Sequence, residues 1–180
     1  MNALILVYSR DGSCVRTAEA IAKRIGGAEI RRLEEAQTRR GVFGFLRSGF
    51  QAATRRPATL VGDPWQGLQP GRHFYLVGPI WAGKPNPVIR AFLEGCYGVS
   101  DAPHDATLRG AEVHLVTVQA DSKHSRAREV HDELSELVVR AGGAVVETAA
   151  LTGAPPGKTS PADEIDRQVR AAIAAENDST

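Results

Sequence analysis

The residues best suited to chemistry come early, in the short polar segment Ser9–Cys14, which reads SRDGSC. It follows the apolar run Ala3–Tyr8, which is too short for a buried helix and predicts a buried strand. Residues Val15–Ile25 then have helical periodicity. The first N–H groups of such a helix have no intrahelical partner, and the helix dipole adds partial positive charge there. The segment therefore predicts an anion site, and phosphate is the expected ligand.

A second candidate segment surrounds Trp81, within Gly78–Pro87, which reads GPIWAGKPNP. It follows the apolar run His73–Gly78, a second predicted strand. Trp side chains are highly buried on average, so the indole could instead belong to the core. The glycine and prolines around it are typical of a stiff loop that presents a ring. We expect Trp81 to border a flat aromatic group.

Alternating strands and helices must position these loops. The predicted strands are Ala3–Tyr8, Ala28–Leu33, His73–Gly78, Glu112–Val118 and Ala144–Leu151. The predicted helices are Val15–Ile25, Asn86–Gly95, Ser125–Ala141 and a closing helix marked by Ile165, Val169 and Ile173. This alternation indicates an α/β fold with a parallel sheet covered on both faces. Because Ala28–Leu33 is polar, we expect it at a sheet edge.

Ligands of open parallel sheets bind outside the carboxyl ends of the strands. Three predicted loops lie at that edge, namely Ser9–Cys14, Pro79–Pro87 and Gln119–Ser125. Together they predict a ligand with a phosphate at one end and a flat aromatic system at the other.

Residues 1–180 are expected to form a single domain, because no segment resembles a linker. Two insertions interrupt the alternation at about 41–72. Gly41–Thr54 predicts an extra amphipathic helix, and Arg55–Arg72 predicts an irregular crossover. The arginines in and before these insertions are interpreted as a solvated face rather than a partner surface.

Composition excludes several classes of function. The 22 Lys and Arg residues nearly balance the 21 Asp and Glu residues, so the net charge of +1 argues against a nucleic-acid partner. The five histidines and two cysteines show no metal-ligand spacing, so no metal is expected. Two cysteines, no signal-peptide pattern and no membrane-length apolar run predict a soluble cytoplasmic protein.

Taken together, the two loops resemble those of flavodoxin-like FMN-binding proteins. The phosphate loop of that family often reads S-x-T-G-N-T and its next loop P-x-W-x-G, where this chain has SRDGSC at 9–14 and PIWAG at 79–83. The likeness follows most of the chain in order, including TAEAIA at 17–22. The resemblance implies a flavodoxin-like three-layer sandwich whose five-stranded parallel sheet has the order 2-1-3-4-5. It also implies FMN as the cofactor.

The resemblance implies three groups of cofactor-binding residues, one for each loop. The phosphate group comprises Ser9, Asp11, Gly12, Ser13, Cys14 and Val15. The group that borders one side of the isoalloxazine comprises Pro79, Ile80, Trp81, Ala82, Gly83 and Lys84. The group that closes the other side comprises Gln119, Ala120 and Asp121.

Four of the candidate residues have an alternative interpretation. Asp11 stands where the family commonly has Thr, and its carboxylate could turn away from a phosphate to cap the helix or brace the loop. Cys14 at a helix start could have a lowered pKa and be redox-reactive, but we prefer a packing role. Lys84 beside a flavin would favour two-electron chemistry, whereas a surface lysine is the preferred interpretation. His124 could move a substrate proton or be a solvated loop residue.

The leading functional hypothesis is an FMN-dependent oxidoreductase. One version is an electron carrier for a redox partner protein, and the other is a reductase that passes electrons from NAD(P)H to a quinone or similar acceptor. By resemblance the short carriers are strongly acidic, so the net charge of +1 favours the reductase. A different class, favoured by Asp11 and Cys14, is a flavodoxin-like binding or assembly module without flavin. A homodimer stays open, and no catalytic side chain is identified.

Overall fold

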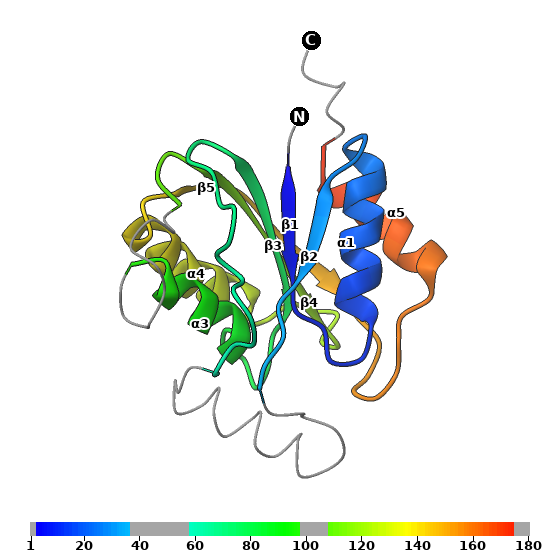
Figure 1. Ribbon diagram of the computed structural model, residues 1–180. Coiled ribbons are helices and arrows are strands. Elements are labelled where there is room, and N and C mark those ends of the chain that lie inside the picture. The colour runs from blue at the N-terminus through cyan, green and yellow to red at the C-terminus, as the bar shows by residue number, and fades with distance from the viewer. Residues whose placement is uncertain (1–2, 37–57, 98–107, 175–180) are drawn as a thin grey trace.

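The computed structural model describes residues 3–36, 58–97 and 108–174, which alternate between strands and helices along the chain (Figure 1). The strands are β1 (Leu4–Val7), β2 (Glu29–Arg32), β3 (His73–Pro79), β4 (Glu112–Gln119) and β5 (Ala144–Thr152). The helices are α1 (Ser13–Arg24), α3 (Pro87–Gly95), α4 (Ala127–Arg140) and α5 (Ala162–Ala172). Each lies within two or three residues of its predicted position. The helix predicted over Gly41–Thr54 falls outside the described residues.

All five strands join one parallel sheet in the order β2-β1-β3-β4-β5, which confirms the predicted topology. The polar strand β2 pairs only with β1 and is an edge strand, as its composition indicated. By contrast, β1 is buried along its whole length. Strand order reverses between β1 and β3, so these two strands flank the point where open sheets of this kind bind ligands.

Helices cover both faces of the sheet, with α1 and α5 on one side and α3 and α4 on the other (Figure 1). Alternate residues of β1 therefore enter different cores. Leu4 and Leu6 pack with Phe92 of α3, whereas Ile5 and Val7 pack with Ile165 of α5. Burial of β1 on both faces explains why its sequence is continuously apolar rather than alternating.

The part of the crossover between β2 and β3 that the structure describes, residues 58–72, consists of turns and one isolated bridge between Leu60 and Glu35. Trp65 anchors this segment to the α3 side of the molecule. Its ring stacks on Phe92 with centroids 6.2 Å apart, and its Nε1–H donates to the Phe92 carbonyl at 3.1 Å. Trp65 therefore serves packing rather than the sheet edge where ligands bind.

Because the strands are parallel, the loops after β1, β3, β4 and β5 meet at the same edge of the sheet, the lower edge in Figure 1. One helix start near this edge is well fixed, since the side chain of Asn86 caps α3 by accepting hydrogen bonds from the amides of Val88 and Ile89. Within residues 3–36, 58–97 and 108–174, no helix has the length and apolar character needed to cross a bilayer.

Candidate functional site

A cavity of about 390 Å³ lies at the carboxyl edge of the sheet, between the loops that follow β1, β3, β4 and β5. Its lining residues are Ser9, Arg10, Asp11, Ser13, Cys14, Pro79, Ile80, Trp81, Ala82, Val118, Gln119, Ala120, Gly153, Ala154, Pro156 and Lys158. The structure thus brings together residues of all three predicted loops. It also adds a wall from a fourth loop, between β5 and α5, which is not among the three predicted loops.

The turn before α1 depends on Gly12. Its φ of 91° is left-handed, and its N–H donates to the Ser9 hydroxyl at 3.0 Å. A Cβ at this position would also lie 3.1 Å from Oγ1 of Thr159, a tight contact that adds to the backbone strain a larger residue would meet here. Gly12 does not itself line the cavity. Helix α1 then begins at Ser13 without a side-chain cap, which leaves its first N–H groups without an intrahelical acceptor.

Asp11 does not cap α1, contrary to one of the two predicted alternatives. Its carboxylate instead accepts two-pronged hydrogen bonds from the Arg10 guanidinium, the shortest at 2.7 Å, and another from the amide of Gly157. Burial on its own would raise the pKa of Asp11, but these bonds and the charge of Arg10 hold it below its usual value. The loop therefore carries an internally neutralised ion pair rather than a lone negative charge.

The hydroxyl of Ser13 is buried and ties the first loop to the fourth. Its Oγ accepts a hydrogen bond from the Ser160 amide at 3.0 Å and lies 3.1 Å from the Ser160 hydroxyl. The Ser160 hydroxyl in turn accepts from the amide of Ala154 at 2.7 Å. Ser13 lines the cavity, so this side chain both borders the site and fixes the wall opposite.

Cys14 is a packing residue, as the preferred interpretation held. Only 3% of it is exposed, and it lies in the core between the sheet and α1. Burial raises the pKa of its thiol to about 12, despite its place at a helix start. The hypothesis of a lowered pKa is therefore wrong, because loss of hydration outweighs the helix dipole at this position.

Trp81 borders the cavity and is also partly packed against the core, so both predicted roles apply. Its ring meets the edge of Tyr8 at 5.7 Å between centroids, with an interplanar angle of 81°. Paired backbone hydrogen bonds between Trp81 and Lys84 close a tight turn. The two central residues of this turn, Ala82 and Gly83, have φ values of 49° and 69°. The left-handed turn fixes the backbone that carries the indole.

Gln119 is the polar side chain of the site without a complete set of partners. It is 8% exposed and lines the cavity, and its Nε2 is buried without a hydrogen-bond acceptor among the described residues. The backbone carbonyl of Gln119 accepts a hydrogen bond from the amide of Gly153 at 2.7 Å. An unsatisfied buried amide next to a cavity is the arrangement expected where a ligand supplies the acceptor.

Five predicted residues do not line the cavity, namely Gly12, Val15, Gly83, Lys84 and Asp121. Asp121 is instead committed to its own loop, where its carboxylate accepts from the amides of Lys123 and Ser125 and from the Ser125 hydroxyl. These bonds, led by the hydroxyl of Ser125, lower the pKa of Asp121. His124 has a φ of 50°, and its Nε2 lies 3.1 Å from Oγ1 of Thr152, so it is held at the sheet edge.

Sequence reasoning missed six lining residues, which are Arg10, Val118, Gly153, Ala154, Pro156 and Lys158. The signal for the fourth loop was present, because it follows a predicted parallel strand and must reach the same edge. Among the described residues, no group of three His, Cys, Asp or Glu side chains is arranged to hold a metal ion.

No protein-family model and no curated protein matches the sequence. Solved structures do match the fold. The Trp repressor binding protein of Bacillus subtilis superposes with a TM-score of 0.64 at 15% identity, and the match covers 96% of each chain. A flavoprotein of Lactobacillus acidophilus, solved in complex with FMN, superposes with a TM-score of 0.60 at 19% identity over 83% of this chain and 92% of its own.

A flavodoxin of Streptococcus pneumoniae TIGR4 gives a TM-score of 0.50 at 11% identity, covering 96% of this chain and all of its own. Identities this low establish architecture rather than ligand. With the strand order, the helices on both faces and the cavity at the switch point, they show that this chain has the flavodoxin-like fold.

Proposed function

We propose that the chain is an FMN-binding flavodoxin-like oxidoreductase. The observation that carries the proposal is that the cavity is lined both by the loop before α1 and by the indole of Trp81. One side is formed by the loop before α1, where no side chain caps the first helix N–H groups, and another by the indole of Trp81. Such an arrangement suits a ligand with an anionic tail and a planar head. The complex of the Lactobacillus acidophilus flavoprotein with FMN adds support at the level of the fold.

The residues present fit FMN. The cavity volume of about 390 Å³ lies within the range of small-molecule sites, about 300–1,000 Å³. Its lining is mainly apolar, with a few polar groups. The buried Nε2 of Gln119 needs an acceptor, which a carbonyl oxygen or ring nitrogen of the isoalloxazine would provide.

The chain's own residues have separable tasks in this proposal. Ser9, Ser13 and the first amides of α1 would bind the phosphate by hydrogen bonds. Trp81 and Ile80 would cover the ring and exclude water from it. Gln119 would orient the ring through its amide, and the buried thiol of Cys14 would stay protonated and take no redox part. Bound FMN would supply the redox chemistry, while the protein would set its orientation and potential.

The net charge of the molecule favours a small-molecule electron acceptor over a partner protein. A carrier that docks on a basic partner gains from a strongly acidic surface, whereas this sequence has a net charge of only +1. We therefore propose a reductase that takes electrons from NAD(P)H and passes them to a quinone or similar acceptor, rather than a carrier for a redox protein. Two buried free cysteines suit a reducing compartment such as the cytoplasm.

A second candidate, a flavin-free binding module, is favoured by the position of Arg10. Its guanidinium carbon lies 5.8 Å from the centroid of the Trp81 ring, while the guanidinium also holds Asp11. A cation already placed over the indole competes with a stacked ligand for that ring. For a flavin to stack on that face of Trp81, the guanidinium of Arg10 would have to move away from the ring.

Calorimetric titration of the purified protein with FMN tests the proposal. We expect saturable one-to-one binding, and a parallel fluorescence titration should show quenching of the flavin. Trp81→Ala should weaken binding about ten-fold, since one stacking contact is worth about 1–3 kcal/mol. Trp65→Phe, which alters an indole remote from the cavity, should bind FMN like the wild type. Protein that takes up no FMN at high concentration would favour the binding module. If FMN binds, oxidation of NADPH only in the presence of a quinone would identify the reductase.

A further inference from the structure

The fourth loop, residues 153–160, contributes one charged residue to the cavity wall, Lys158. Pro155–Lys158 forms a β-turn in which the Lys158 amide donates to the Pro155 carbonyl at 3.0 Å. Gly157 occupies the third position of this turn with a φ of 82°, as a type II turn requires, and Pro156 fixes the second position. The backbone that carries Lys158 is therefore stiff.

The same loop is fastened to the start of α1 by several hydrogen bonds, including one from the Arg16 guanidinium to the Ser160 carbonyl. The Ser160 amide and hydroxyl bind the hydroxyl of Ser13, and the Thr159 hydroxyl donates to the backbone carbonyl of Asp11. The amide of Gly157 binds the carboxylate of Asp11. In Figure 1 the loops before α1 and before α5 lie together at the lower edge of the sheet, in agreement with these contacts. Lys158 thus belongs to the end of the cavity where the α1 amides are.

Charge counting singles out Lys158 among the lining residues. The charged lining residues are Arg10, Asp11 and Lys158, and the rest are neutral. Arg10 and Asp11 cancel in their ion pair, with N–O distance 2.7 Å. No ion pair joins Lys158 to another described residue. The net positive charge of the cavity wall is therefore that of Lys158.

We propose that Lys158 is a specificity-determining residue that makes this cavity select a phosphorylated flavin over its uncharged, unphosphorylated form. The inference rests on the proposed function and deepens it. Backbone amides bind a phosphate but cannot balance its full charge, and the carboxylate of Asp11 stands in the same loop. A lysine whose backbone is fixed by a rigid turn at that end can bring its ammonium to the dianion, and this attraction is absent for uncharged riboflavin. Because Lys158 is exposed, its effect is reduced by salt.

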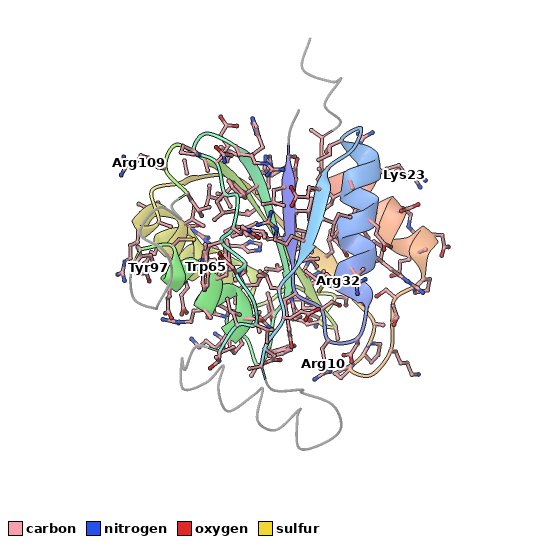
Figure 2. All side chains as sticks on the ribbon, viewed as in Figure 1. Arg10, Lys23, Arg32, Trp65, Tyr97 and Arg109 are labelled. Carbon is pink, nitrogen blue, oxygen red and sulfur yellow. The ribbon has the colours of Figure 1, made fainter. Side chains whose placement is uncertain are left out.

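The test compares FMN and riboflavin by calorimetry on the full chain, at low and at high salt. Lys158→Gln should weaken FMN binding about ten-fold at low salt and less at high salt, and should leave riboflavin binding unchanged. Lys158→Arg keeps the charge and should restore most of the preference. Lys23→Gln is the matched control, because Lys23 is an exposed cation at the opposite end of α1 (Figure 2).

The outcomes separate this inference from the function on which it rests. Wild-type protein that binds FMN and riboflavin equally would overturn the role of Lys158, as would an equal loss of both ligands in Lys158→Gln. An FMN affinity in Lys158→Gln that matches the wild type at low salt would also overturn it. Wild-type protein that binds neither flavin would instead overturn the proposed function itself.

Discussion

At the scale of single residues, burial decides which chemistry a side chain can perform. The types and spacing of Cys14 and Asp11 allowed several roles, and the surroundings selected one. Burial in the core keeps the thiol of Cys14 protonated, and the guanidinium of Arg10 neutralises the carboxylate of Asp11. Only Gln119 keeps a buried polar atom that nothing in the described part of the site satisfies. That residue, rather than a reactive group, is the clearest sign of a ligand.

The thiols provide a direct prediction at this scale. Burial raises the pKa values of both Cys14 and Cys96 to about 12, so neither is ionised near neutral pH. We expect the native protein to react with a thiol reagent far more slowly than the urea-unfolded chain, in which both cysteines react. Cys14→Ala identifies which thiol contributes. Rapid modification of Cys14 in the native protein would contradict its assignment to the core.

How much of the site could be predicted depends on distance along the chain. Ser9 and Trp81 belong to continuous segments whose pattern indicates a role, and both line the cavity. No continuous segment indicates a role for Lys158. Its place beside the first loop depends on contacts such as that between Ser13 and Ser160, 147 residues apart. The carboxylate of Asp121 accepts from the amide and hydroxyl of Ser125, a pairing that the linear pattern did not indicate, and its predicted place beside the ring stays a prediction. Such choices depend on the folded loop.

At the scale of elements, the sequence predicted strands more securely than their ends. Buried parallel strands such as β1 are continuously apolar, so their existence and order could be inferred. The ends depend on capping and turn geometry, and the predicted helix start at Asn86 is the cap rather than the first residue of α3. The predicted helix at Ser125 starts two residues later because Ser125 is engaged by Asp121.

The cap of α3 gives a prediction for this scale. Asn86 is 2% exposed, and its Oδ1 accepts from the Val88 amide at 2.8 Å. Asn86→Ala should lower the free energy of unfolding by about 1 kcal/mol, as measured by urea denaturation, because a helix amide loses its acceptor. Asn86→Ser keeps an acceptor oxygen and removes the unsatisfied Nδ2, so it should lose less. Equal losses in the two variants would show that packing, not capping, is the role of Asn86.

At the scale of the whole molecule, the sheet joins two cores, and a buried histidine links its stability to pH. His131 of α4 is 8% exposed, and its Nε2 lies 2.8 Å from the Thr117 hydroxyl on β4. Burial lowers its pKa below the ordinary 6.5, although the charge of Asp132 opposes this. The unfolded chain therefore binds a proton at a pH where the native protein does not. The native state therefore has its full stability with respect to this histidine above about pH 6.5, and it loses stability as the pH falls toward the lowered pKa of His131.

This linkage predicts a difference between wild type and His131→Gln, whose amide can still bond to Thr117. Between about pH 6.5 and the folded pKa, the wild type should lose up to about 1.4 kcal/mol of unfolding free energy per pH unit from this group. The variant should lack that component and keep only the loss shared with other titrating groups. Urea denaturation at a series of pH values measures it. Parallel profiles for the two proteins would show that His131 is protonated equally in both states.

The central claim is that four loops at the carboxyl edge of the sheet form one FMN site. The most direct measurement is a two-dimensional NMR titration of ¹⁵N-labelled protein with FMN. We predict saturable shifts in the backbone amides of Ser9–Cys14, Ile80–Ala82, Val118–Ala120 and the non-proline residues of Gly153–Lys158, and a shift in the side-chain amide of Gln119. Spectra that stay unchanged at saturating FMN, or shifts confined to the outer surfaces of α1 and α5, would contradict the account.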